Sequence, residues 1–239
     1  MRPIVFLPTY NERENVRTII PEILEAVPES SILVIDDNSP DGTAEVVKQM
    51  MAQESRIKLL ERSQKQGLGE AYKYAYQEAL KENGWDVVIT MDADGSHDPT
   101  YLPAMLDALR SADIVIGSRY VDCGGIEDWE TWRYVLSKYG NLYSRILTGT
   151  GIYDLTAGFI TVRRSLIERM DFRDLGASGY AYQIEFKVHA LKELGAVARE
   201  IPIHFRSRRE GESKISRHVI SEGLKTPLKL FIRRFNRKT

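Results

Sequence analysis

The chain has 239 residues, of which 43% are hydrophobic and 28% are charged, and its formal net charge is −1. These values predict one folded domain, or a domain with a small appendage, and a charge near zero gives no field that would attract nucleic acid. The one cysteine, Cys123, excludes an intramolecular disulfide. No apolar run approaches the roughly 20 residues that span a bilayer, so we expect any membrane contact to come from one side.

The first half of the chain alternates short apolar runs, typical of buried strands, with amphipathic runs that predict helices. The strands are predicted at 4–7, 31–36, 57–60, 87–91 and 114–117, and the helices at 14–26, 43–52, 70–81 and 101–110. This alternation with short connections predicts an α/β fold with parallel strand pairing and helices on both faces. Ligands of such sheets bind at the carboxyl ends of the strands, so the residues after each strand are the first candidates for a site.

The second half is less regular. It has a glycine-containing acidic loop over 122–132, and its patterns predict helices at 132–147 and 182–194 and strands at 158–162 and 197–203. The sequence shows no repeat and no low-complexity linker. We therefore expect one compact body followed by a C-terminal helix.

Acidic residues follow three of the predicted strands. They lie in the stretches Pro8-Thr9-Tyr10-Asn11-Glu12, Asp36-Asp37-Asn38-Ser39 and Asp92-Ala93-Asp94-Gly95-Ser96. Clustered carboxylates repel one another unless a cation or hydrogen bonds offset them, and a hard divalent ion such as Mg²⁺ or Mn²⁺ is the expected partner. Each stretch alone is also explained by turns and helix caps, but three at one sheet edge favour a metal and phosphate site.

Other nucleotide and metal motifs are absent from the sequence. There is no G-x-G-x-x-G after the first strand and no G-x-x-x-x-G-K-[ST], which argues against a dinucleotide site and a P-loop. The four histidines are scattered, and we expect His97 to be a turn or surface residue rather than a metal ligand.

Basic residues gather in the second half. Arg119 ends the fifth strand, Arg133 and Ser137 are one helical turn apart, and Arg208 and Lys214 share a late loop. Arginine side chains suit phosphate oxygens. For Arg133, Arg208 and Lys214, the pattern fits a solvated surface equally well.

The segment 217–239 combines apolar and basic residues at helical spacing. Leu224, Leu228 and Phe231 are spaced to share one face, and Lys225, Lys229 and Arg233 the opposite face. This pattern is typical of a helix on an anionic membrane surface, but it also fits a helix that packs on the body, so both interpretations stay open.

A family resemblance rests on nine segments in a fixed order. They are 8–16 (PTYNERENV), 36–47 (DDNSPDGTAEVV), 67–72 (GLGEAY), 91–103 (MDADGSHDPTYLP), 117–120 (GSRY), 137–149 (SKYGNLYSRILTG), 154–159 (DLTAGF), 179–185 (GYAYQIE) and 200–216 (EIPIHFRSRREGESKIS). They resemble the family 2 glycosyltransferases of GT-A fold, and among these the dolichol-phosphate or polyprenol-phosphate mannose synthases. The resemblance implies a Rossmann-like, mostly parallel sheet, with a catalytic domain over 1–216 that has a nucleotide-binding half to about residue 120 and an acceptor half from about 121.

The resemblance also implies roles for single residues. The donor would be bound by Pro8, Tyr10, Glu12, Ile35, Asp37, Asp92, Ala93, Asp94, Ser96, Arg208 and Lys214. The metal ion, Mg²⁺ or Mn²⁺, would be held by Asp92 and Asp94, and the acceptor phosphate by Arg119, Arg133 and Ser137. Asp94, Arg119 and Arg133 would be the catalytic residues. Some relatives have glutamine where this chain has the shorter Ser96.

The implied activity is metal-dependent, inverting transfer of mannose from GDP-mannose to dolichyl or polyprenyl phosphate. We expect the protein at the cytoplasmic face of a membrane, as a peripheral protein held by the 217–239 helix or by a membrane-anchoring partner subunit, with no nucleic-acid partner. One alternative is a polyprenyl-phosphate glucosyltransferase that uses UDP-glucose. Another is a haloacid-dehalogenase-like phosphatase, because Asp92-Ala93-Asp94-Gly95-Ser96 fits D-x-D-G-[ST], although that motif normally follows the first strand. A third is a non-catalytic membrane-binding subunit.

Overall fold

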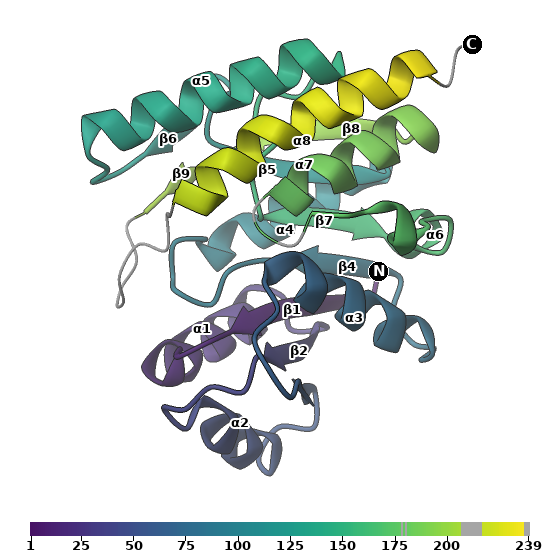
Figure 1. Ribbon diagram of the computed structural model, residues 1–239. Coiled ribbons are helices and arrows are strands. Elements are labelled where there is room, and N and C mark those ends of the chain that lie inside the picture. Colours follow the sequence, from purple (N-terminus) through teal and green to yellow (C-terminus); the bar gives the residue numbers. More distant parts are fainter. Residues whose placement is uncertain (178, 180, 207–216, 237–239) are drawn as a thin grey trace.

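A computed structural model describes residues 1–177, 179, 181–206 and 217–236 (Figure 1). The predicted donor residues Arg208 and Lys214 lie outside the described residues. Within them, the central sheet has seven strands in the order β3-β2-β1-β4-β7-β5-β8. Their bounds are β1 Pro3–Thr9, β2 Ser31–Asp36, β3 Ile57–Glu61, β4 Val87–Thr90, β5 Ile114–Ser118, β7 Ile160–Arg163 and β8 Ala198–Pro202. All neighbours pair in parallel except β7, which is antiparallel to both β4 and β5.

Helices cover both faces of the sheet. The α-helices are α1 Arg13–Ala26, α2 Thr43–Met51, α3 Leu68–Leu80, α4 Leu102–Ala108, α5 Thr131–Thr148, α6 Arg164–Ile167, α7 Ala181–Val188 and α8 Arg217–Asn236, with short 3₁₀ turns at Pro99–Tyr101, Leu109–Ser111 and Phe172–Asp174. Since successive side chains of a strand point to opposite faces, Ile4 and Phe6 of β1 join the core under α3 and α7, whereas Val5 and Leu7 join the core under α1, α2 and α4. The predicted architecture, a mostly parallel sheet between helical layers, is confirmed.

The second half differs from the prediction in three respects. The strand at 158–162 begins at Ile160 and runs antiparallel; its apolar run reads the same in either direction, so the pattern could not set its orientation. The helix at 182–194 is α7 followed by a π-helical turn, His189–Glu193. Two-residue strands β6 (Gly125–Ile126) and β9 (His204–Phe205) pair in parallel and are too short to show a period.

The C-terminal helix packs on the body. In Figure 1, α8 lies beside α5 at the top of the molecule and also crosses α7, in agreement with the contacts between these helices. Tyr143 Oη of α5 donates to the backbone oxygen of Leu224 at 3.0 Å, and Arg233 pairs with Asp174 at 2.9 Å. Packing on the body, one of the two interpretations of this segment, is therefore observed.

Candidate active site

A pocket of about 300 Å³ lies at the carboxyl ends of β1, β2 and β4. Its lining includes most of the described residues predicted to bind the donor: Pro8, Tyr10, Glu12, Asp37, Asp92, Ala93 and Asp94. Ile35 and Ser96 are fully buried and are not part of its lining. The strand-end rule therefore brought together residues that are distant in the sequence.

The loops after β1 and β2 are tied to each other by hydrogen bonds. Asn11 and Asn38 have φ angles of 61° and 57°, a left-handed conformation that asparagine tolerates better than most residues. The Asp36 carboxylate accepts from Thr9 Oγ1 at 2.8 Å and from Ser39 Oγ at 2.6 Å. Of the two adjacent aspartates, Asp36 therefore braces the loops, and Asp37 is the one that faces the pocket.

Arg62 positions Asp37. Its Nη1 donates to Asp37 Oδ1 at 2.6 Å, and its Nη2 donates to Gln66 Oε1 at 2.9 Å. Burial raises the pKa of Asp37 above its ordinary value, and the guanidinium of Arg62 opposes that shift. The sequence analysis missed Arg62 because it searched the strand ends for carboxylates; the same search for basic residues finds it directly after β3.

A lysine that the sequence analysis also missed lies at the pocket rim. Lys65 Nζ is 3.7 Å from the centre of the Tyr10 ring, a cation–π contact, and Lys65 lines the pocket. It belongs to the connection between β3 and α3, where no motif pointed to it.

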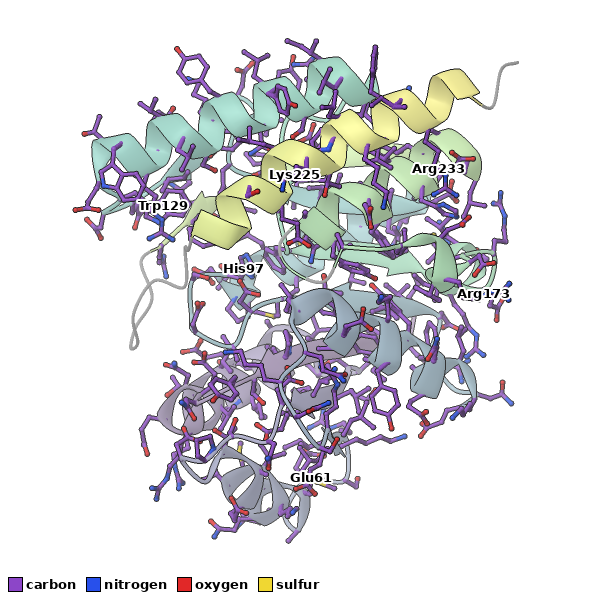
Figure 2. All side chains as sticks on the ribbon, in the orientation of Figure 1. Glu61, His97, Trp129, Arg173, Lys225 and Arg233 are labelled. Carbon is purple, nitrogen blue, oxygen red and sulfur yellow. The ribbon has the colours of Figure 1, made fainter. Side chains whose placement is uncertain are left out.

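The Asp92-Ala93-Asp94 turn is held by its own neighbours. Ser96 donates to Asp94 Oδ1 from its backbone nitrogen at 3.0 Å and from its hydroxyl at 2.6 Å. The backbone nitrogen of Asp92 donates to Nδ1 of His97 at 2.9 Å. His97 lies in the bend that follows β4, as one of its two expected places, but it is buried and stacks on Phe159 with ring centroids 4.9 Å apart, so it is not at the surface. It lies between the two halves of the molecule in Figure 2.

The donor atoms of this turn fit a hard divalent cation. In the described part of the chain, no group of three or more His, Cys, Asp or Glu side chains forms a metal cage. Mg²⁺ sites of phosphate-transferring enzymes are usually built from one or two carboxylates together with the substrate phosphates. Asp92 and Asp94, both at the pocket, supply that number.

A buried ion pair lies close enough to Asp92, a residue of the pocket, for the Asp92 carboxylate to contribute to the raised pKa of Arg119. Arg119 donates from Nε and Nη2 to the two oxygens of Asp154, both at 2.7 Å, and its backbone nitrogen donates to the same carboxylate at 3.1 Å. Burial alone would lower the pKa of Arg119, but Asp154 raises it; burial alone would raise the pKa of Asp154, but Arg119 lowers it. Both groups are therefore charged at neutral pH.

Aromatic side chains gather the predicted acceptor residues. The guanidinium of Arg133 lies 3.9 Å from the centre of the Trp129 ring, and that of Arg119 lies 5.8 Å from it. Ser137 Oγ accepts from Tyr120 Oη at 2.7 Å. Trp129, labelled in Figure 2, and Tyr120 thus join the predicted acceptor residues into one group, which we call the arginine cluster (Arg119, Arg133, Ser137, Tyr120 and Trp129). Its role stays a prediction.

Comparison with known proteins decides the family. The profile of Glycosyl transferase family 2 matches residues 4–171. The chain belongs to glycosyltransferase family 2. It is 42% identical over 225 residues to the polyprenol monophosphomannose synthase of Mycolicibacterium smegmatis, covering 93% of this chain and 84% of the relative. It is 40% identical over 224 residues to the undecaprenyl-phosphate mannosyltransferase of Micrococcus luteus, covering 94% of this chain and 91% of the relative.

Solved structures share the fold of this family 2 glycosyltransferase. Glucosyl-3-phosphoglycerate synthase from Mycobacterium tuberculosis, in complex with Mn²⁺, UDP and glucosyl-3-phosphoglycerate, matches with a TM-score of 0.66 at 21% identity, over 94% of this chain and 79% of that one. A mannosyltransferase from Pyrobaculum calidifontis in complex with GDP-Man and Mn²⁺ matches with a TM-score of 0.58 at 16% identity, over 96% and 73%. The predicted family, GT-A fold and glycosyltransferase class are confirmed. The phosphatase alternative loses its ground, because its motif lies inside the matched range.

Proposed function

We propose that this glycosyltransferase transfers mannose from GDP-mannose to a polyprenyl or dolichyl phosphate in an inverting reaction that depends on Mg²⁺ or Mn²⁺. The observation that carries the proposal is that the arginine cluster lies near the carboxylate pocket, since Arg119 interacts electrostatically with Asp92. The pocket suits a nucleotide diphosphate with a metal, and the cluster suits a second phosphate. The names of two relatives at 40% and 42% identity, which act on polyprenol or undecaprenyl phosphate and mannose, support the choice of substrates.

On the donor side, Asp92 and Asp94 would hold the metal ion, which offsets the charge of the departing diphosphate. Tyr10 and Asp37, at the ends of β1 and β2, would bind the nucleoside. Enzymes of the same fold were solved with GDP-Man and Mn²⁺ and with UDP and Mn²⁺, so the fold suits either donor. The names of the two relatives, which both refer to mannose, favour GDP-mannose over the alternative donor, UDP-glucose.

On the acceptor side, the substrate needs little activation. A phosphate monoester has its second pKa near ~6 and is largely dianionic at pH 7, so no general base is required. Arg119 and Arg133 would bring this anion to the donor despite the carboxylates nearby. A phosphate oxygen then attacks the anomeric carbon while the bond to the diphosphate breaks on the opposite side, which inverts the configuration.

The lipid acceptor requires a membrane surface, and the structure offers a candidate. None of the described helices is both long and apolar enough to cross a membrane. Large apolar side chains are instead exposed on α5 and α8, among them Trp132 (56%), Tyr139 (63%), Leu142, Ile146 (69%), Leu224, Leu228 and Ile232. Basic residues of α8 such as Lys225 accompany them (Figure 2). We propose that both helices, rather than α8 alone, rest on the cytoplasmic face of the membrane, with or without an anchoring subunit.

The test is transfer by the purified chain. GDP-mannose and UDP-glucose are supplied separately with polyprenyl phosphate, with Mg²⁺, Mn²⁺ or a chelator. The proposal predicts a mannosylated lipid phosphate from GDP-mannose that disappears with the chelator. Transfer that persists without metal would contradict the metal site, and preference for UDP-glucose would favour the alternative.

A further inference from the structure

One buried amide near the carboxylate pocket has an unsatisfied oxygen. Gln183 lies on α7 and its side chain is 1% exposed. Its Oε1 has no hydrogen-bond partner within the part of the chain that the structure describes. Buried polar atoms without a partner are rare in folded proteins because each one loses its hydrogen bonds to water, so this oxygen needs an explanation.

The nitrogen end of the same amide, Nε2, borders a space that a glycine leaves open. A β-carbon added to Gly158 would lie 3.7 Å from Gln183 Nε2, 3.8 Å from Asp92 Oδ1 and 3.8 Å from His97 Cε1. These are ordinary contact distances, so a methyl group would fit. The φ angle of Gly158 is outside the left-handed region, so the backbone does not demand glycine. The space lies where an amide, a candidate metal-ligand carboxylate and an imidazole meet.

The chemistry of the amide selects the ligand. A phosphate offers only negatively charged acceptor oxygens, which would be repelled by Oε1 and by the Asp92 carboxylate. A hydroxyl group both donates and accepts, so it satisfies either end of an amide. The transferred sugar, with its diphosphate held at Asp92 and Asp94 as proposed above, would bring hydroxyl groups to this position.

We propose that Gln183 binds a hydroxyl group of the sugar being transferred and contributes to the choice of donor sugar. The inference rests on the proposed function, since it needs a nucleotide sugar at Asp92 and Asp94. A site built to hydrogen-bond a substrate hydroxyl rejects the analogue that lacks it, because the buried polar group is then left unpaired.

The test replaces the amide with a side chain of similar size and no hydrogen-bonding groups, Gln183→Met. We expect kcat/KM for GDP-mannose to fall about tenfold or more, as for the loss of a hydrogen bond worth roughly 1.4 kcal/mol. The affinity for GDP with Mn²⁺ should be unchanged, because GDP carries no sugar. Thr161→Val is the matched control, because it removes a different buried polar group without a partner, the hydroxyl of Thr161 on β7. This variant should keep the wild-type kcat/KM for GDP-mannose and the wild-type affinity for GDP.

Donors that each lack one sugar hydroxyl sharpen the result. One of these donors should have a low kcat/KM with the wild type, and Gln183→Met should not lower that kcat/KM further. Wild-type kcat/KM in the variant, or an equal loss of affinity for GDP or Mn²⁺, would overturn the inference, since the second result means that Gln183 only orients Asp92. If Gln183→Met does not fold, Gln183→Asn, which keeps the amide but withdraws it, is judged by the same criteria. A wild-type chain that transfers no sugar refutes the proposed function itself, whereas active wild type with an equally active variant refutes this inference alone.

Discussion

The buried ion pair between Arg119 and Asp154 allows a quantitative prediction. The side chains are 8% and 0% exposed, and the pair makes two hydrogen bonds of 2.7 Å. Asp154→Asn keeps the shape but leaves the guanidinium without its counter-charge. Removing one partner of a buried pair costs about 3–5 kcal/mol, a large part of the roughly 5–15 kcal/mol that stabilises a typical domain. The backbone nitrogen of Asp154 stays bonded to Glu200 at 2.9 Å, so the loop itself should hold.

The assay is equilibrium unfolding in urea, with the free energy of unfolding extrapolated to water. Asp171→Asn is the matched control, because Asp171 pairs with Arg173 at the same 2.7 Å but at the surface, with side chains 44% and 89% exposed, where ion pairs contribute little. The double variant Arg119→Met with Asp154→Leu removes both charges and should recover much of the lost stability. A cost below about 1 kcal/mol for Asp154→Asn, or one no greater than that of Asp171→Asn, would refute the reasoning.

Three further predictions follow from other contacts. Ser96→Ala should weaken Mn²⁺ binding in the presence of GDP about tenfold, measured by calorimetry, because the hydroxyl orients Asp94. Thr100→Ala removes the equivalent bond to Asp98 at 2.7 Å and should leave Mn²⁺ binding unchanged, so equal affinities in both variants would contradict the role of Ser96. Burial lowers the pKa of Lys187 to about 7, so above that pH the unfolded chain binds more protons than the folded one and stability rises with pH. Between about pH 6 and about pH 8.5, the unfolding free energy of the wild type should rise by about 2 kcal/mol relative to that of Lys187→Met. Parallel pH profiles of the two proteins would count against a buried amine of low pKa. Tyr139→Glu with Ile146→Glu should reduce co-sedimentation with anionic vesicles at least about tenfold, since each side chain buried in lipid contributes roughly 1.5–3 kcal/mol. Val197→Glu, at a side chain 55% exposed, should leave co-sedimentation unchanged. Undiminished binding of the double variant would rule out the α5 surface as the membrane contact.

The donor half of the site was predictable because each parallel strand is recognisable from a short apolar run in the sequence. Asp37, Asp92 and Asp94 each follow an apolar run, and the strand-end rule brings such residues to one edge whatever lies between them. Ser96 was placed near the metal ligands only by the resemblance, and its hydrogen bonds to Asp94 came from the structure.

The acceptor half was less accessible to sequence reasoning. Asp154 is 35 residues from Arg119, and the two meet only because β7 runs antiparallel beside β5, a direction that no periodicity encodes. All residues of α7 are buried, so this helix shows no polar stripe that would have singled out Gln183. Where every residue of a helix is buried, the pattern of apolar residues does not identify the functional ones, and only the hydrogen bonds in the structure do.

The central claim, mannose transfer to a lipid phosphate, is tested most directly by competition in one reaction. The purified chain receives equal amounts of GDP-mannose and UDP-glucose, with the mannose uniformly carbon-13-labelled so that the two isobaric hexoses differ in mass, together with polyprenyl phosphate and Mn²⁺. Mass spectrometry of the lipid fraction should show the labelled hexose on the lipid phosphate as the dominant product. A dominant unlabelled product, or no hexose on the lipid phosphate, would contradict the account.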